Sequence, residues 1–101
     1  MIARVWRGVV RADDADEYAA YVQDTGIESY KQTPGNLGAW LLRRPDGDRE
    51  EIVTLSFWDS VPSIEAFAGA DIDRAVYYPE DERYLLERDP HVVHYQVPDA
   101  E

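Results

Sequence analysis

Residues 50–58, with the sequence EEIVTLSFW, carry the pattern that most restricts how this chain can fold. The alternation predicts a β-strand with large apolar side chains on both of its faces. One face carries Val53, Leu55 and Phe57, and the other carries Trp58 at its end. An apolar sheet face left in water is costly, so both faces of the sheet that contains this strand need a cover.

The other periodic segments place this strand in the order β-α-β-β-α-β. Strands are predicted at 2–11, 37–44, 50–58 and 91–97, and helices from about 14 to 24 and from about 61 to 69. Thr25-Gly26 is interpreted as the stop of the first helix, with one more helical turn predicted from Ile27 to Lys31 before the break at Thr33-Pro34-Gly35. A short helix is predicted over 72–76, and one or two further helical turns over 79–86. Pro45-Asp46-Gly47-Asp48 is typical of a hairpin turn.

This order predicts an α+β domain of ferredoxin-like type, with a four-stranded antiparallel sheet and both helices on one side. The 101 residues fit one domain, expected over 1–97, followed by a polar tail at 98–101. The helices cover only one sheet face. We therefore expect the face of Val53, Leu55 and Phe57 to be covered by a second copy in a homodimer with twofold symmetry.

Charge and composition exclude several classes of partner and site. The net charge of −11 opposes binding to nucleic acid and to anionic membranes. There are no cysteines, which excludes thiolate catalysis and thiolate metal sites. The start of the chain lacks the apolar run of a signal peptide and no segment is long enough to span a membrane, so a cytoplasmic location is expected. His91 and His94 are three residues apart in a strand, so they face opposite ways and are not expected to share a metal.

Four segments of the chain resemble the antibiotic biosynthesis monooxygenase family. They are MIARVWRG, TPGNLGAWLLRR, SFWDSVPSIEAFAG and YYPEDERYLLERDPHVVHYQV, and they cover nearly the whole chain. The resemblance implies a dimeric α+β barrel, in which each protomer has a pocket between its sheet and its helices. It also implies one of two activities: cofactor-free oxygenation of phenolic polycycles to quinones, or haem degradation.

The resemblance favours the cofactor-free branch. In that branch a Trp near the end of the third strand lines the pocket, and Trp58 matches it in position. The haem-degrading branch uses an Asn on the first strand and a His on or just after the second helix. Here the first position falls at or beside Trp6, and residues 61–76 contain no His. We therefore expect no cofactor and no metal.

A cofactor-free oxygenase must hold a flat ring, exclude water and stabilise a substrate anion. His94 is the candidate general base, because imidazole titrates near neutral pH, and Arg4 is the candidate partner of the anion. Trp6, Trp58 and Tyr78 are the candidate substrate-binding residues. Alternatives remain open for each: Trp58 as a core residue, His91 in place of His94, and Arg4 paired with an acidic neighbour.

Two functions are compatible with these residues. The first is a monooxygenase that oxidises a small aromatic or polyketide-like substrate, such as a phenol, anthrone or hydroquinone. The second is a non-catalytic dimeric protein that binds a small hydrophobic ligand or acts in stress. The enzyme hypothesis predicts an enclosed cavity that holds at least one ring, lined by Trp58 and by Arg4, Tyr78 or His94.

Overall fold

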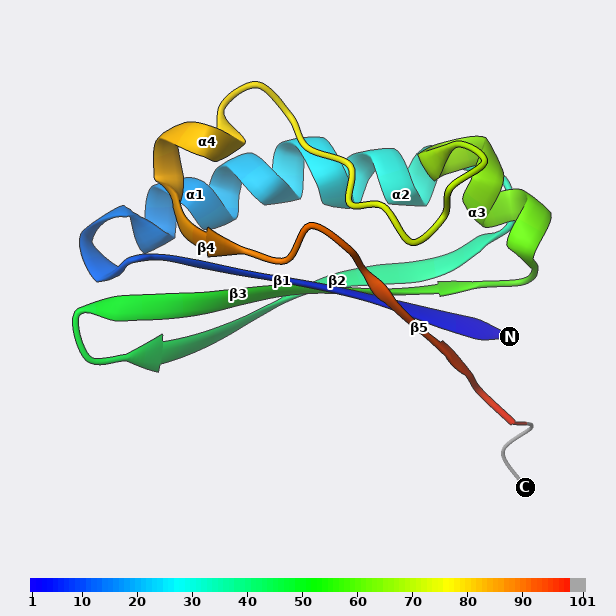
Figure 1. The fold of residues 1–101 in the computed structure, drawn as a ribbon, viewed down its shortest axis with the longest axis horizontal. Helices are drawn as coiled ribbons and strands as arrows, with labels where there is room; N and C mark the ends of the chain where they lie inside the picture. Colours follow the sequence, from blue (N-terminus) through cyan, green and yellow to red (C-terminus); the bar gives the residue numbers. More distant parts are fainter. Residues whose placement is uncertain (99–101) are drawn as a thin grey trace.

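The computed structural model describes residues 1–98, which form an antiparallel sheet with all helices on one face (Figure 1). The strands are β1 (Ile2–Arg11), β2 (Asn36–Asp46), β3 (Arg49–Trp58), β4 (Leu85–Arg88) and β5 (Val93–Gln96). Their order is β2-β3-β1-β4, and β5 also pairs with β1. The α+β, ferredoxin-like prediction is confirmed. Of the predicted tail, residues 99–101 lie outside the described residues.

The fourth strand position holds two short strands rather than one. β4 pairs with one end of β1, where Gly8 lies opposite Arg88, and β5 pairs with the other end, where Ile2 lies opposite Gln96. The two lie one after the other along the same edge of β1 (Figure 1). The prediction of helical turns through Leu85 and Leu86 is therefore wrong. The ten residues of β1 offer enough unpaired backbone for both strands.

The first helical region runs without the predicted stop and continues through the further turn expected at residues 27–31. It comprises η1 (Ala12–Asp14), α1 (Ala15–Val22), the π-helical turn η2 (Gln23–Ile27) and α2 (Glu28–Gln32). The predicted stop at Thr25-Gly26 falls inside η2 and is wrong. Ile27 and Tyr30, which follow it, are buried against the sheet, and this packing outweighs the local preference of glycine. Within the turn, Thr25 Oγ1 donates a hydrogen bond to the carbonyl of Tyr21 at 2.7 Å.

The second helix, α3 (Val61–Ala68), begins and ends as predicted. The Ser60 hydroxyl caps its start by accepting from the amide of Ser63 at 3.4 Å, and Gly69 ends it with a φ of 88°. Residues 69–80, called the cover segment below, then run to α4 (Asp81–Tyr84) without the helix predicted at 72–76. Instead, backbone hydrogen bonds join Ala75 N to the Pro90 carbonyl at 3.0 Å and Val92 N to the Asp73 carbonyl at 2.8 Å.

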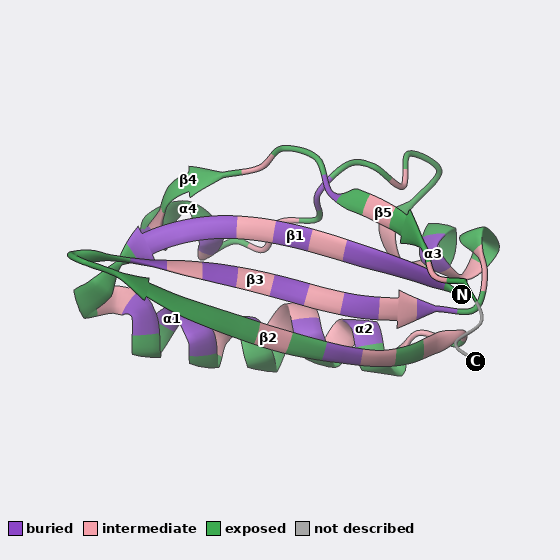
Figure 2. Cartoon of the chain, turned by 90° about the horizontal axis from the view of Figure 1, so that it is seen from below, coloured by how far each residue is buried: buried purple, intermediate pink, exposed green. Residues whose placement is uncertain are grey.

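The two faces of the sheet differ in cover, as the alternation of β3 predicts. Trp58 is completely buried beneath the helices. Val53, Leu55 and Phe57 are half-buried on the opposite face, and Trp40 from β2 is 51% exposed there. Figure 2 views this second face, which carries no helix. We call it the open face.

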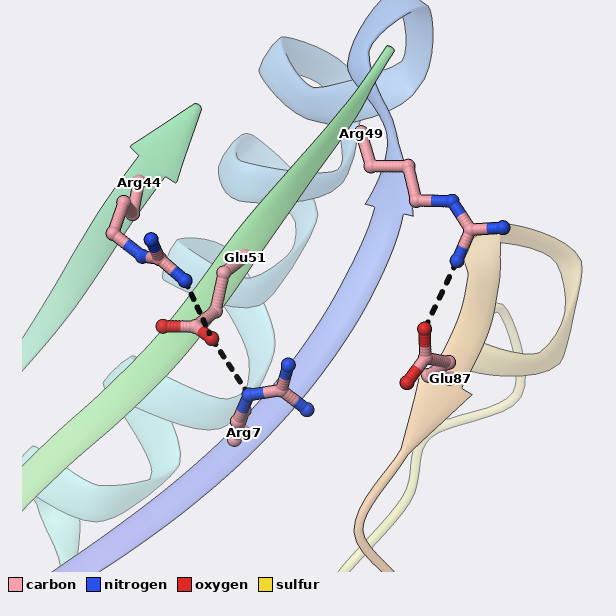
Figure 3. Close-up of polar contacts among 5 residues, drawn as sticks. All are labelled: Arg7, Arg44, Arg49, Glu51 and Glu87. Atoms are coloured by element: carbon pink, nitrogen blue, oxygen red, sulfur yellow. Dashed lines mark hydrogen bonds and ion pairs between the residues drawn. The ribbon is translucent and has the colours of Figure 1, made fainter. Parts of the chain in front are cut away.

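Charged side chains occupy the hairpin end of the open face and pair with one another (Figure 3). Glu51 on β3 accepts from Arg7 on β1 at 2.6 Å and lies 3.5 Å from Arg44 on β2. Arg49 contacts Glu87 of β4 at 2.9 Å. The arginines hold the pKa of Glu51 below its usual range. The open face therefore has an apolar centre and a self-paired charged end.

Candidate functional site

A cavity of about 30 Å³ lies between the sheet and the helices. Aromatic side chains form much of its wall: Trp6, Tyr18, Tyr30, Phe67, Tyr77 and Tyr78. Thr25, Thr54 and Asp81 add polar groups. A cavity that takes up benzene measures roughly 150 Å³, so this one has room for water and not for a ring as it stands.

The sheet side of the cavity is formed by Trp6, which is held in place by its neighbours. Trp6 Nε1 donates to Tyr77 Oη at 3.3 Å, and that hydroxyl donates to the carbonyl of Asp89 at 2.5 Å. A Cβ atom at Gly8 would lie 2.5 Å from Trp6 Cη2, so only glycine leaves room for the indole ring there. The register of β1 against β4 shifts between Val9 and Val10, just beyond Gly8.

The helix side of the cavity contains a buried carboxylate, Asp81, which is 5% exposed. Its Oδ1 accepts from the Tyr18 hydroxyl of α1 at 3.0 Å, and its Oδ2 accepts from the amide of Tyr78 at 2.6 Å. Burial raises the pKa of Asp81, while these two hydrogen bonds oppose the rise. Burial also raises the pKa of Tyr18. From the sequence, the run Pro79-Glu80-Asp81-Glu82 has the composition of a catalytic carboxylate cluster, but negative charge at a helix N-terminus is the favoured interpretation.

A sequence signal for Asp81 did exist. Tyr84 lies three residues after it, which places both on one side of a helical turn. Tyr84 is buried, so the acid that shares its side is drawn inward with it. Of the acids in the run Glu80-Asp81-Glu82, only Asp81 is buried.

The structure brings the two candidate catalytic residues, Arg4 and His94, together beside the cavity rather than on its wall. Arg4 is 1% exposed, and its Nη1 donates to the carbonyl of Ile72 at 2.5 Å and to His94 Nε2 at 3.0 Å. His94 Nδ1 lies 3.1 Å from a carboxylate oxygen of Asp73. Since arginine only donates, the Arg4 contact fixes Nε2 as the acceptor and Nδ1 as the protonated nitrogen. The guanidinium of Arg4 packs on Phe67, 5.8 Å from the ring centre.

The remaining sequence candidates divide between the cavity and the core. Trp6 and Tyr78 line the cavity. Trp58 does not line it: its Nε1 donates to Ser56 Oγ at 2.9 Å, and its ring packs against Phe67 with 6.1 Å between ring centres. This is the core alternative considered for Trp58. His91 is exposed at the bridge to Arg74 and also lies away from the cavity.

The contacts of His94 predict a pH dependence of stability. Burial and the Arg4 charge lower the pKa of His94. The unfolded chain then binds this proton more tightly than the folded chain. The stability that neutral His94 contributes is therefore complete above its ordinary pKa of about 6.5 and is lost as the pH falls below it. Urea unfolding between pH 5 and 8 should show this loss in the wild type and in the His91→Gln control. It should be reduced in His94→Gln, and equal pH slopes in all three would contradict the assignment.

A surface groove of about 450 Å³ lies next to the cavity. Phe67, Val76 and Tyr78 line both the groove and the cavity. Val76 and Tyr78 belong to the cover segment, and Val76 is 38% exposed. The wall between solvent and the aromatic cavity is thus formed in part by side chains of a segment without regular helix or strand.

Two further properties concern the described residues as a whole. Within residues 1–98, no three imidazole or carboxylate groups gather closely enough to hold a metal ion. Over the same range, no helix has the length and apolar character needed to cross a membrane.

Comparison with solved structures identifies several proteins of the same fold. A Nitrosomonas europaea protein assigned to the antibiotic biosynthesis monooxygenases is 18% identical, with a TM-score of 0.68 over 98% of this chain and 100% of its own. A Bacillus cereus protein with the same assignment is 13% identical, with a TM-score of 0.70 over 99% and 95% of the two chains. The haem degrader MhuD from Mycobacterium tuberculosis, solved with two haems in its active site, is 16% identical, with a TM-score of 0.62 over 100% and 99%.

Comparison by sequence identifies one protein family. No curated protein matches the chain. The family model described as antibiotic biosynthesis monooxygenase matches residues 1–76, which include β1, β2, β3 and α3. The matched range covers about three quarters of the chain and includes the Trp6 side of the cavity. The chain therefore belongs to the antibiotic biosynthesis monooxygenase family.

Proposed function

We propose that this protein is a cofactor-independent monooxygenase that oxidises a small aromatic or polyketide-like substrate with O₂. The observation that carries the proposal is the cavity between sheet and helices, which combines aromatic walls with a buried carboxylate in a chain of this family. For an anthrone, the reaction converts a ring CH₂ and one O₂ into a quinone C=O and one water. The electron-rich substrate anion supplies the electrons to dioxygen.

Substrate entry requires the cover segment to move, because the cavity of about 30 Å³ is too small for a ring. Displacement of Val76 and Tyr78 would join the cavity to the groove of about 450 Å³, since both side chains line both spaces. The segment has no regular helix or strand over 69–80, which makes it the part of the wall that moves at least cost.

Once a ring is bound, the aromatic walls hold it in a fixed orientation. Trp6, fixed by Tyr77 and by the absence of a side chain at Gly8, gives a flat apolar surface against which a ring stacks. Closure of the cover segment then excludes water, which strengthens every electrostatic interaction with the developing anion. Arg4 packs on the Phe67 ring and is hydrogen-bonded to His94. We assign both residues to supporting the cavity wall rather than to contacting the substrate.

We also propose that a second copy of the chain covers the open face. Trp40, Leu42, Val93 and Tyr95 are each about half exposed there, around half-buried Leu55. A surface of this apolar character is costly in water, and a twofold contact removes it from water on both copies. The charged end is compatible with close approach, because Glu51 already has two arginine partners.

Oxygen uptake tests the proposed activity. With 1,8-dihydroxyanthrone as the probe and EDTA present, we expect consumption of one O₂ per anthrone at a rate well above spontaneous oxidation. Val22→Phe, which fills the cavity from α1, should abolish the uptake, while the exposed Ala20→Phe on the same helix should leave it unchanged. Uptake equal to that without protein, across anthrones and hydroquinones, would refute the proposal. Binding without uptake would favour the ligand-binding alternative.

Haem degradation has less support from the residues of this chain. The matched structure of MhuD holds haem, but residues 61–76 here contain no His to bind iron. Trp6 lies at or beside the first-strand position where the haem-degrading branch has an Asn, and its Nε1 hydrogen is donated to the Tyr77 hydroxyl. A titration with haemin serves as a control for the oxygen-uptake experiment.

A further inference from the structure

The cavity contains a carboxylate without a cationic partner. Within residues 1–98, two acidic side chains are strongly buried, Glu50 at 7% exposed and Asp81 at 5%. Glu50 pairs with Arg43, as expected for a buried charge. Among the described residues, Asp81 forms no ion pair, and its hydrogen bonds come only from a neutral hydroxyl and a backbone amide. Keeping this carboxylate in an aromatic cavity costs desolvation free energy that no ion pair offsets.

The groups around Asp81 leave its carboxylate basic. Tyr18 contacts it from α1, and Tyr77 and Tyr78 line the same cavity from the cover segment. The positive charge that acts on Asp81 is Arg88 of β4, which stacks over Tyr77 at 4.7 Å from the ring centre. Burial outweighs the attraction of Arg88 and raises the pKa of Asp81. A carboxylate whose pKa is raised accepts a proton from a weak acid more readily than an exposed one does.

Resting on the function proposed above, we infer that Asp81 is the general base that takes the acidic proton of the substrate, and that the Tyr18 hydroxyl positions its carboxylate. The Asp81 carboxylate removes a proton from the anthrone CH₂ or the phenol OH and leaves a carbanion or phenolate. This anion transfers an electron to O₂, and the two resulting radicals join in a new C–O bond as a peroxide anion. Protonated Asp81 returns its proton to the peroxide, and for an anthrone the hydroperoxide then loses water to form the quinone carbonyl.

Asp81 also has a structural role that the test must separate from catalysis. Its Oδ2 accepts from the amide of Tyr78 and so anchors the cover segment to α4. Asn preserves this contact, because its oxygen accepts from Tyr78 while its NH₂ donates to the Tyr18 hydroxyl. Asp81→Asn therefore removes the base and keeps the fold. Glu82→Gln is the matched control, since the Glu82 carboxylate is next to Asp81 in sequence but is 81% exposed.

The experiment follows ionisation without oxygen and turnover with oxygen, with 1,8-dihydroxyanthrone as the probe. Without oxygen, the wild type and Glu82→Gln should bind the anthrone and show the absorbance of its enolate. Asp81→Asn should quench Trp fluorescence on binding but show no enolate. With oxygen, Asp81→Asn should lose at least about a hundredfold in kcat. In Tyr18→Phe, the loss of a hydrogen bond to the carboxylate raises the pKa of Asp81, so the rise of kcat with pH should move to higher pH.

The outcomes separate this inference from the function on which it rests. Equal enolate formation and equal kcat in the wild type and Asp81→Asn would overturn the role of Asp81 and leave the oxygenase intact. Enolate formation that depends on Asp81 without oxygen uptake would support the base and refute the oxygenase. If the wild type does not bind the anthrone, both fail together.

Discussion

Replacing Trp58 with alanine should lower the free energy of unfolding by about 3–5 kcal/mol. Trp58 is completely buried, and its ring packs against Tyr30 and Phe67 with 5.9 and 6.1 Å between ring centres. The truncation removes these contacts and leaves the hydroxyl of Ser56, itself fully buried, without the donor that it now has. For a domain of about 100 residues, a loss of this size is a large part of the total stability.

Urea unfolding followed by circular dichroism measures this loss. Trp58→Phe is the matched variant, because it keeps an aromatic ring and loses only the indole nitrogen and part of the volume, so its loss should be smaller. Val61→Ala, on the exposed side of α3, should change stability little. A loss below about 1 kcal/mol for Trp58→Ala would show that the ring is not a central part of the core.

Replacing Leu55 with glutamate should convert the proposed dimer to monomers. Leu55 lies in the middle of the open face, directly between Val5 on β1 and Trp40 on β2. Twofold symmetry would bury two such carboxylates at one contact, and an uncompensated buried charge costs about 3–5 kcal/mol. The dissociation constant should therefore rise by about a hundredfold or more.

Sedimentation at micromolar concentration measures the result. The wild type should sediment at about twice the chain mass of 11.6 kDa, and Leu55→Glu at the chain mass. Val61→Glu adds the same charge on the helix layer and should remain dimeric. A wild type that sediments only as the single chain would refute the dimer.

The alternation of β3 was sufficient to predict both faces of the sheet. A period-two pattern reflects which face of a strand is buried. The structure follows that period: Trp58 pairs with Ile2 on the helix side, and Leu55 pairs with Val5 on the open side. The start of α3 was equally predictable, since the Ser60 cap and the Gly69 stop are local signals.

Elements that depend on distant partners were not predictable from the sequence. A further turn at Ile27 and Tyr30 was predicted, but the unbroken passage through Gly26 was not, because it depends on the packing of Ile27 and Tyr30 against the sheet. β4 forms because the edge of β1 is available beside it, which no pattern within Leu85–Arg88 reveals. The same limit applied to the site. His94 and Arg4 were candidates by residue type, whereas the spacing to Tyr84 is a local signal for Asp81 and its burial also needs α1 and the cover segment.

The proposed oxygenase activity depends most on whether the cavity opens to hold a flat ring. The most direct measurement is a crystal structure of the protein with 1,8-dihydroxyanthrone, prepared without oxygen. We predict the ring between Trp6 and Asp81, with Val76 and Tyr78 displaced from their present positions on the cavity wall. An anthrone bound elsewhere, with the cavity still at about 30 Å³, would contradict the proposed binding site.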